Sequence, residues 1–203
     1  MEGLPAAIWS VHDDLQSLPS LVRSRPVAAI VSCARRSQSR RYPDDRFNDS
    51  QGASLGGRRK RGAAAQAIGR SRGGRTTKIH VVVDGKGRPI AIQVTAGQLG
   101  DARAAPALLG SLPPGRLCAG DGAYDSDGLR QFLAERGTLP VIPNNPTRKR
   151  LHPFDAEAYK QRNLVERMFC RLKDFRRIAT RYDKLAANYF SAVALAAIAT
   201  WWT

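Results

Sequence analysis

The stretch Tyr159-Lys-Gln-Arg-Asn-Leu-Val-Glu-Arg-Met-Phe-Cys-Arg-Leu-Lys173 contains no proline or glycine, and good helix formers dominate it. It therefore predicts an α-helix, in which successive residues are about 100° apart. Four polar residues then fall within an arc of roughly 60°: Tyr159, Arg162, Glu166 and Lys173. A neighbouring arc is apolar and holds Leu164, Val165, Met168, Phe169 and Leu172. We expect the apolar arc to be buried and the polar strip beside it to carry a carboxylate between two cations and a phenol.

An amphipathic helix with a solvated charged face would explain this wheel equally well. The spacing of the four polar residues is more specific: Tyr, two residues, Arg, three residues, Glu, six residues, Lys. That spacing is the signature of the DDE transposases of bacterial insertion sequences, and the chain resembles insertion-sequence family five of this group. The resemblance runs from about residue 62 to residue 202. It includes Ala-Ile-Gly-Arg-Ser-Arg-Gly-Gly at 67–74 and Asp-Gly-Ala-Tyr-Asp-Ser-Asp at 121–127.

The resemblance implies a ribonuclease-H-like α/β fold, with a mixed sheet and flanking helices. The implied activity is metal-dependent strand cleavage and transesterification of DNA at insertion-sequence ends. Asp121 becomes the second acidic ligand and Glu166 the third, together holding Mg²⁺ or Mn²⁺. Arg162 and Lys173 would neutralise phosphate charge, and Tyr159 would hydrogen-bond or stack beside the scissile strand. Without the resemblance, an Asp at the end of a short strand beside glycines is well placed to hold a cation, but it is more often a helix cap or a solvated loop residue.

The first catalytic Asp of the family is expected upstream of residue 69, in a motif like Asp-Ser-Thr-x-Val-(Arg/Lys)-Ala-His, which this chain lacks. The genetic code allows several codons for each of residues 45–54. If a suitable set of these codons is read one nucleotide forward, it encodes Ile-Asp-Ser-Thr-Ile-Val-(Lys/Arg)-Ala-His-(Arg/His), which is the missing motif. We therefore expect residues 1 to about 57 to come from the wrong frame and the first catalytic strand to be missing. A backward slip of one nucleotide near residues 58–61 would then supply the motif.

Two function classes stay open on these grounds. The chain either contributes the second Asp and the Glu to a transposase, or it is a catalytically inactive DNA-binding fragment or a frame-shifted open reading frame of one. A ribonuclease H or a Holliday-junction resolvase would share the fold, but neither explains the spacing of the four polar residues.

Composition points to nucleic acid. Lys and Arg number 33 against 17 Asp and Glu, a net charge of +16, which favours a polyanionic partner. We expect double-stranded DNA, as terminal repeats and target, and either self-association or contact with the upstream-frame product. Basic residues flanking the flexible Gly73-Gly74 turn and in the later loop are the expected DNA contacts: Arg70, Arg72, Arg75, Lys78, Arg148, Lys149 and Arg150.

The sequence shows no pattern typical of a zinc site, a disulfide framework, a secreted protein or a membrane protein. Cys33, Cys118 and Cys170 have no zinc-like spacing, and neither a signal peptide nor a membrane span is expected. The sequence thus predicts a cytoplasmic, nucleoid-associated bacterial protein.

The chain divides into a poorly ordered basic tail over residues 1–61 and a partial catalytic domain over residues 62–203. In the second part, periodicity and turn residues predict alternating elements. These are strands at 78–83, 90–95, 117–119 and 139–142, and helices at 101–111, 126–136, 155–173 and 188–202. Asp101, Asp125 or Ser126, and Asp155 are the expected helix caps. His80 is expected to be a sheet residue, and the final helix to pack in the core in preference to stacking Trp201 and Trp202 on DNA.

Overall fold

The computed structural model describes residues 28–37, 66–71 and 74–202, and these build one six-stranded mixed sheet. Its strands run in the order β2-β3-β1-β5-β6, and β4 also pairs with β3. Their bounds are β1 Ala28–Ser37, β2 Gly69–Ser71, β3 Gly74–Val83, β4 Pro89–Ala96, β5 Leu117–Gly120 and β6 Leu139–Val141.

The sheet combines an antiparallel half with a parallel half. The strand β3 pairs antiparallel with both β4 and β1, whereas β1 pairs parallel with β5, and β5 parallel with β6. The β3–β4 hairpin lies where alternation and the Asp84-Gly-Lys-Gly87 turn predict it. The Asp84 carboxylate stabilises this turn by accepting hydrogen bonds from the backbone N–H groups of Lys86 and Arg88, both at 2.9 Å.

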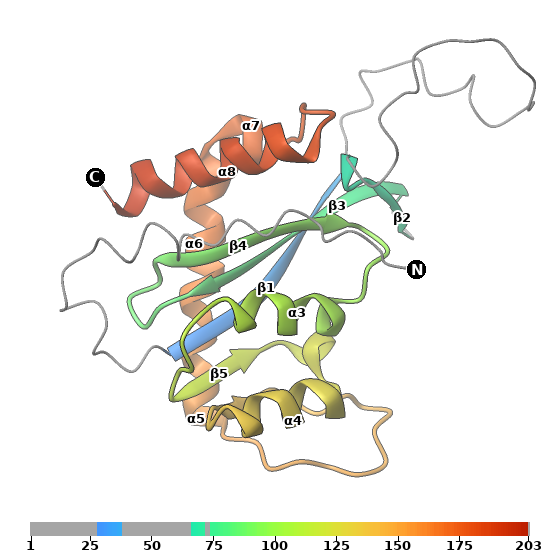
Figure 1. Ribbon diagram of the computed structural model, residues 1–203, viewed down its shortest axis with the longest axis vertical. Helices are drawn as coiled ribbons and strands as arrows, with labels where there is room; N and C mark the ends of the chain where they lie inside the picture. The colour runs from blue at the N-terminus through green and yellow to red at the C-terminus, as the bar shows by residue number, and fades with distance from the viewer. Residues whose placement is uncertain (1–27, 38–65, 72–73, 203) are drawn as a thin grey trace, which may run out of the picture.

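The strand β1 belongs to the segment that we assign to the basic tail. It lies inside the sheet between β3 and β5 (Figure 1), paired through Ile30 with Val83 and through Val31 with Gly120. The boundary expected near residue 61 therefore leaves one strand of the sheet on its N-terminal side. The rest of the tail lies outside the described residues, so its poor order stays a prediction.

Helices cover both faces of the sheet (Figure 1). The helices α3 (Asp101–Gly110) and α4 (Asp127–Glu135) pack on one face, in a cluster with Val82, Cys118 and Tyr124. On the other face, α6 (Asn163–Asp174), α7 (Arg176–Ala179) and α8 (Ala186–Trp201) pack against Ile79, Val81 and other strand residues. This division follows from the alternation of side chains along β3. No helix within the described residues is both long and apolar enough to span a bilayer.

The helix predicted over residues 155–173 forms in three pieces. These are α5 (Ala156–Tyr159), a 3₁₀ turn η4 (Lys160–Arg162), and α6. Asp155 caps the first piece by accepting the backbone N–H of Ala158 at 3.0 Å, as predicted. The predicted apolar arc is confirmed, because Val165, Met168, Phe169 and Leu172 are buried and Leu164 packs against their cluster.

Of the other two predicted helix caps, one is confirmed and one is wrong. Ser126 caps α4 by accepting the backbone N–H of Leu129 at 3.2 Å. The prediction for Asp101 is wrong, since Gly100 is the N-cap residue of α3 and the Asp101 carboxylate accepts from Lys78 instead. A buried ammonium competes for that carboxylate and holds it against the sheet.

Candidate functional site

Asp121 stands at the C-terminal end of β5, where the sequence predicts it. It is the N-cap residue of the 3₁₀ turn η3 (Gly122–Tyr124), and its Oδ1 accepts the backbone N–H of Ala123 at 3.0 Å. Its Oδ2 lies 4.0 Å from Nη2 of Arg162, and 31% of the side chain is exposed. Partial burial raises the pKa of Asp121, although the Ala123 N–H and the Arg162 guanidinium act in the opposite direction.

Arg162 joins the two carboxylates of the predicted site. Its Nη1 donates to Oε1 of Glu166 at 2.6 Å, while its Nη2 faces Asp121. A single guanidinium therefore contacts a carboxylate at a strand end and another on α6. The Nε of Arg162 is buried and has no hydrogen-bond acceptor within the described residues. Within this part of the chain Arg162 therefore retains an unsatisfied donor next to the two carboxylates, and a buried N–H left unpaired is costly.

The two remaining members of the polar strip lie differently. Tyr159 is half-buried against the core cluster below α6, with its ring 5.8 Å from the Arg162 guanidinium and edge-on to Phe154 at 5.2 Å. It thus forms one wall beside Arg162. Lys173 is exposed near the end of α6, two helical turns after Glu166. Its ammonium can approach a polyanion from solvent.

The donor set fits part of a divalent metal site. Asp121 and Glu166 supply hard carboxylate oxygens, which Mg²⁺ and Mn²⁺ prefer. Within the described residues, however, no three His, Cys, Asp or Glu side chains come together as a metal-binding group. Asp121 and Glu166 are therefore the two carboxylates that could hold a cation in this part of the chain, and the absence of the first catalytic Asp stays a prediction.

Lys78 needs a correction, because we expect it to contact DNA and the structure buries it. Its side chain is 4% exposed, and its Nζ donates to Oδ1 of Asp101 and to the Leu99 carbonyl, both at 2.6 Å. His80, two residues along β3, is also buried and bonds Thr95 and Tyr124. Burial lowers the pKa of His80 to about 4, so this sheet residue is neutral near pH 7.

Arg148 is likewise engaged within the protein. Its Nε bonds Oδ2 of Asp125 at 2.9 Å and its Nη1 bonds Oδ1 of Asp127 at 2.6 Å. This pairing fastens the loop of residues 143–153 to the start of α4. Arg148 thus has a structural role, while Lys149 and Arg150 on the same loop are exposed, and the DNA contacts of all three stay predictions.

The Asp125 carboxylate at the centre of this attachment is missed by the sequence reasoning, which considers it only as a helix cap. Its side chain is fully buried, and it accepts from the Nε groups of Arg130 and Arg148 and from the Asn145 backbone N–H at 2.7 Å. Burial alone would raise the pKa of Asp125, but these donors hold it at about 2. The sequence does contain a signal for this pairing, because Asp125 belongs to the family motif at 121–127 and the later loop of residues 143–153 is rich in basic residues.

Arg181 is a second residue that the sequence reasoning does not single out. It is 1% exposed and donates to the carbonyls of Gln66, Asp183 and Lys184 and to the Thr77 hydroxyl. It also stacks on the Tyr189 ring at 4.9 Å. The contacts tie the segment before β2 to the connection between α7 and α8.

The other predicted DNA contacts lie at the start of β3. Arg70 on β2 and Arg75 on β3 are cross-strand partners, and both are exposed. Arg72 lies outside the described residues. The positions of Arg70 and Arg75 suit contact with phosphate.

Comparison of the chain with known proteins places it in a family. The family model described as "Transposase DDE domain" matches residues 43–202. A predicted transposase of insertion sequence element IS6501 from Brucella ovis is 39% identical over 127 residues, which cover 62% of this chain and 98% of that protein. A predicted transposase of element IS402 from Burkholderia cepacia is 28% identical over 188 residues, 86% of each chain.

Proposed function

The chain belongs to the DDE transposase family, and on that premise we propose that it cleaves and rejoins DNA strands at the ends of an insertion sequence. The observation that carries the proposal is the single Arg162 guanidinium between the carboxylates of Asp121 and Glu166. A guanidinium that contacts two carboxylates keeps both of them near one point, which is what holding a divalent metal beside a scissile phosphate requires.

The fold supports the same proposal. A sheet in which an antiparallel β4-β3-β1 half continues into a parallel β1-β5-β6 half is the arrangement expected of a ribonuclease-H-like domain. In this arrangement β1 takes the place of the first catalytic strand, and the second carboxylate follows the parallel strand beside it. Asp121 satisfies the second condition.

Each residue of the site has a role that its surroundings allow. Asp121 and Glu166 would hold Mg²⁺ or Mn²⁺, which stabilises charge at the phosphorus centre and activates the attacking oxygen. Arg162 orients both carboxylates, and its positive charge would favour a phosphate nearby. Tyr159 limits one side of the site, and Lys173 approaches the strand from solvent. DNA with its 3′-hydroxyl or a water supplies the nucleophile.

A catalytically inactive DNA-binding fragment is the second candidate, and one observation favours it. Val31 of β1 pairs with Gly120 of β5, so the residue that follows Val31 in the chain is level with Asp121. That residue is Ser32, which cannot supply a carboxylate. With two ligands the site holds one cation weakly, and two-metal chemistry needs both ions positioned together.

The experiment that separates the two candidates compares this chain with a version fused in the alternative frame, so that Ile-Asp-Ser-Thr precedes residue 62. Both are incubated with Mg²⁺ and DNA that carries the element's ends, and strand cleavage is measured. We expect the fused protein to cleave faster by orders of magnitude, and its Glu166→Gln variant to lose that activity.

Two outcomes would overturn this reasoning. Equal cleavage by both proteins would refute the argument from the missing carboxylate. Cleavage by neither would leave the enzymatic proposal without support and favour the DNA-binding fragment.

A further inference from the structure

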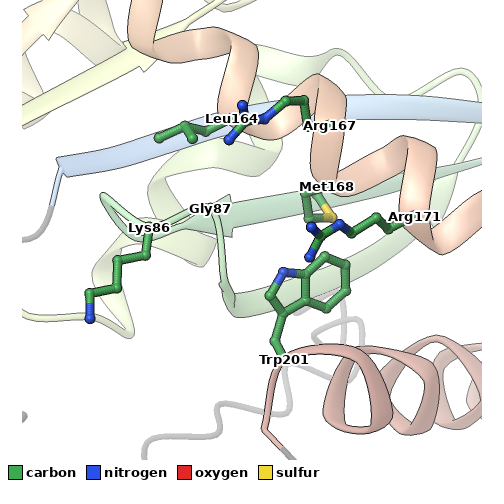
Figure 2. A pocket seen from close by; sticks show the side chains of 7 residues that line it. All are labelled: Lys86, Gly87, Leu164, Arg167, Met168, Arg171 and Trp201. Carbon is green, nitrogen blue, oxygen red and sulfur yellow. The ribbon is translucent and has the colours of Figure 1, made fainter.

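A cavity of about 280 Å³ lies on the α6 side of the sheet, away from the carboxylate pair. Its walls come from three elements (Figure 2): the β3–β4 turn with Lys86, the helix α6 with Arg167 and Arg171, and the end of α8 with Trp201. Met168 forms part of its floor. The volume is near the lower end of the range for ligand pockets, so it suits one nucleotide-sized group better than a duplex.

The charge of this cavity is uncompensated within the described part of the chain. Lys86, Arg167 and Arg171 are all exposed, and none of the three forms an ion pair or a side-chain hydrogen bond with a described residue. Other arginines nearby are paired, as Arg88 is with Asp84 at 2.7 Å. Three cations around one hollow repel one another unless an anion lies between them.

The aromatic wall narrows the class of ligand. Trp201 is half-buried and packs against the core cluster, so its indole is held at the edge of the cavity. Figure 2 shows Arg171 and Trp201 extending toward each other from α6 and α8, with Met168 beside them. Cations that follow a backbone, together with a fixed aromatic face for a base, are the features by which proteins bind single-stranded nucleic acid.

The geometry points to a binding site for single-stranded DNA, in which Lys86, Arg167 and Arg171 contact phosphates and Trp201 stacks on an unpaired base. On α6, Arg167 and Arg171 are turned about 100° and 140° from Glu166. The strand is therefore held beside the carboxylate pair and not in it. This inference rests on the proposed function in one respect, which is that the bound polyanion is DNA.

The test uses the full chain and a fluorescent oligothymidylate, with affinity measured by anisotropy over a range of salt. The double variant Arg167→Gln/Arg171→Gln should flatten the plot of log affinity against log salt by about 1.4, which is about 0.7 for each single-strand phosphate contact. Between 50 and 200 mM salt, the unaltered chain should then lose about sevenfold more affinity than the variant.

The chain offers a matched control away from this cavity, in Arg103 on α3 and Arg116 just before β5. Arg103 and Arg116 are exposed, and neither side chain has an ion pair within the described residues. The pair Arg103→Gln/Arg116→Gln removes the same charge and should leave the salt slope near that of the unaltered chain. Equal flattening by both pairs, or by neither, would overturn the assignment.

Stacking is tested separately, with thermal unfolding as a check on folding. Trp201→Leu should weaken oligothymidylate binding about fivefold or more, while Trp201→Phe should retain part of it. Unchanged binding by a folded Trp201→Leu chain would remove the base from the proposal. A sedimentation change in Arg167→Gln/Arg171→Gln without a change in DNA affinity would identify a second copy of the chain as the occupant and refute the DNA site.

Failure here is distinguishable from failure of the proposed function. The difference in salt slope caused by Arg167→Gln/Arg171→Gln should persist in the Glu166→Gln background, because Glu166 lies on another face of α6 than these two arginines. If the chain binds oligothymidylate as expected but the fused protein does not cleave DNA, the proposed enzymatic function is refuted and the single-strand site stands. If the fused protein cleaves DNA but the arginine variants bind oligothymidylate normally, the single-strand site alone is refuted.

Discussion

Replacing Asp125 by Asn should unfold the chain at a markedly lower temperature. The buried carboxylate is replaced by an amide, which keeps one acceptor but turns an NH₂ group toward Arg130 or Arg148. A shift of the Asp125 pKa from about 3.9 to about 2 corresponds to about 2.6 kcal/mol. Breaking a buried ion pair by removing one partner costs about 3–5 kcal/mol, so about 3 kcal/mol is the expected loss.

The loss should be visible by calorimetry or circular dichroism as a fall in Tm of about 6–12 °C at pH 7, since 1 kcal/mol is worth about 2–4 °C in a chain of this size. The matched control is Asp174→Asn, because Asp174 is exposed on α6 and surface changes of this kind stay within about 0.5 kcal/mol.

The pH dependence of this difference provides the sharper criterion. Because the folded-state pKa of Asp125 is depressed, its contribution is complete above the unfolded pKa of about 4 and is lost as the pH falls toward 2. The gap between the unaltered chain and Asp125→Asn should shrink over that window. A gap below 1 °C at pH 7, or one that is as large at pH 2.5 as at pH 7, would refute the reasoning.

Three further substitutions have a predicted direction of effect on stability or on metal binding. Asp121→Asn should not lower the Tm at pH 8, because stability from a carboxyl whose pKa is raised is lost as the pH rises through that pKa, and the two proteins should converge in acid; a lower Tm at pH 8 would contradict this. Arg181→Met should cost about 3 kcal/mol or more by chemical denaturation, since it leaves buried carbonyls unpaired, whereas exposed Arg176→Met should cost under about 0.5 kcal/mol. Arg162→Gln should lower the Mg²⁺ concentration needed to raise the Tm, because the guanidinium that pairs with the Glu166 carboxylate is removed. A higher Mg²⁺ concentration for the same rise in Tm would show that Arg162 helps to hold the metal.

The features that the sequence predicts correctly are set by neighbouring residues. The buried arc of α6 follows from helical periodicity, and Arg162 and Glu166 meet because residues four apart share a helix face. The β3–β4 hairpin follows from a four-residue turn. The cap by Ser126 is equally local, since its acceptor serves a backbone N–H three residues away.

The features that the sequence does not predict depend on partners far along the chain. Lys78 is buried by Asp101, 23 residues away, and Arg148 is held by Asp125, also 23 residues away. An unpaired basic residue and a paired one look alike in a sequence, so both are counted among the DNA contacts. The strand β1 escapes detection for the same reason, because its pairing with β3 and β5 compensates for weak local periodicity.

The 3₁₀ turn at Lys160–Arg162 explains why Tyr159 departs from the predicted polar strip. A 3₁₀ helix turns about 120° per residue where an α-helix turns about 100°. Over three residues the difference amounts to about 60°, which rotates Tyr159 relative to Glu166. Tyr159 consequently packs against the core and over Arg162 while Glu166 stays exposed.

Met168 belongs to the core cluster and also to the floor of the cationic cavity, so the packing of α6 orients two surfaces at once. The helix cannot rotate to improve one surface without moving the other, because Glu166 and Arg167 are adjacent residues whose directions differ by about 100°. Packing of Val165 and Leu172 against the sheet fixes that rotation. Cavity-forming substitutions in this stripe should therefore weaken cation binding and strand binding together, whereas Arg171→Gln should weaken strand binding alone.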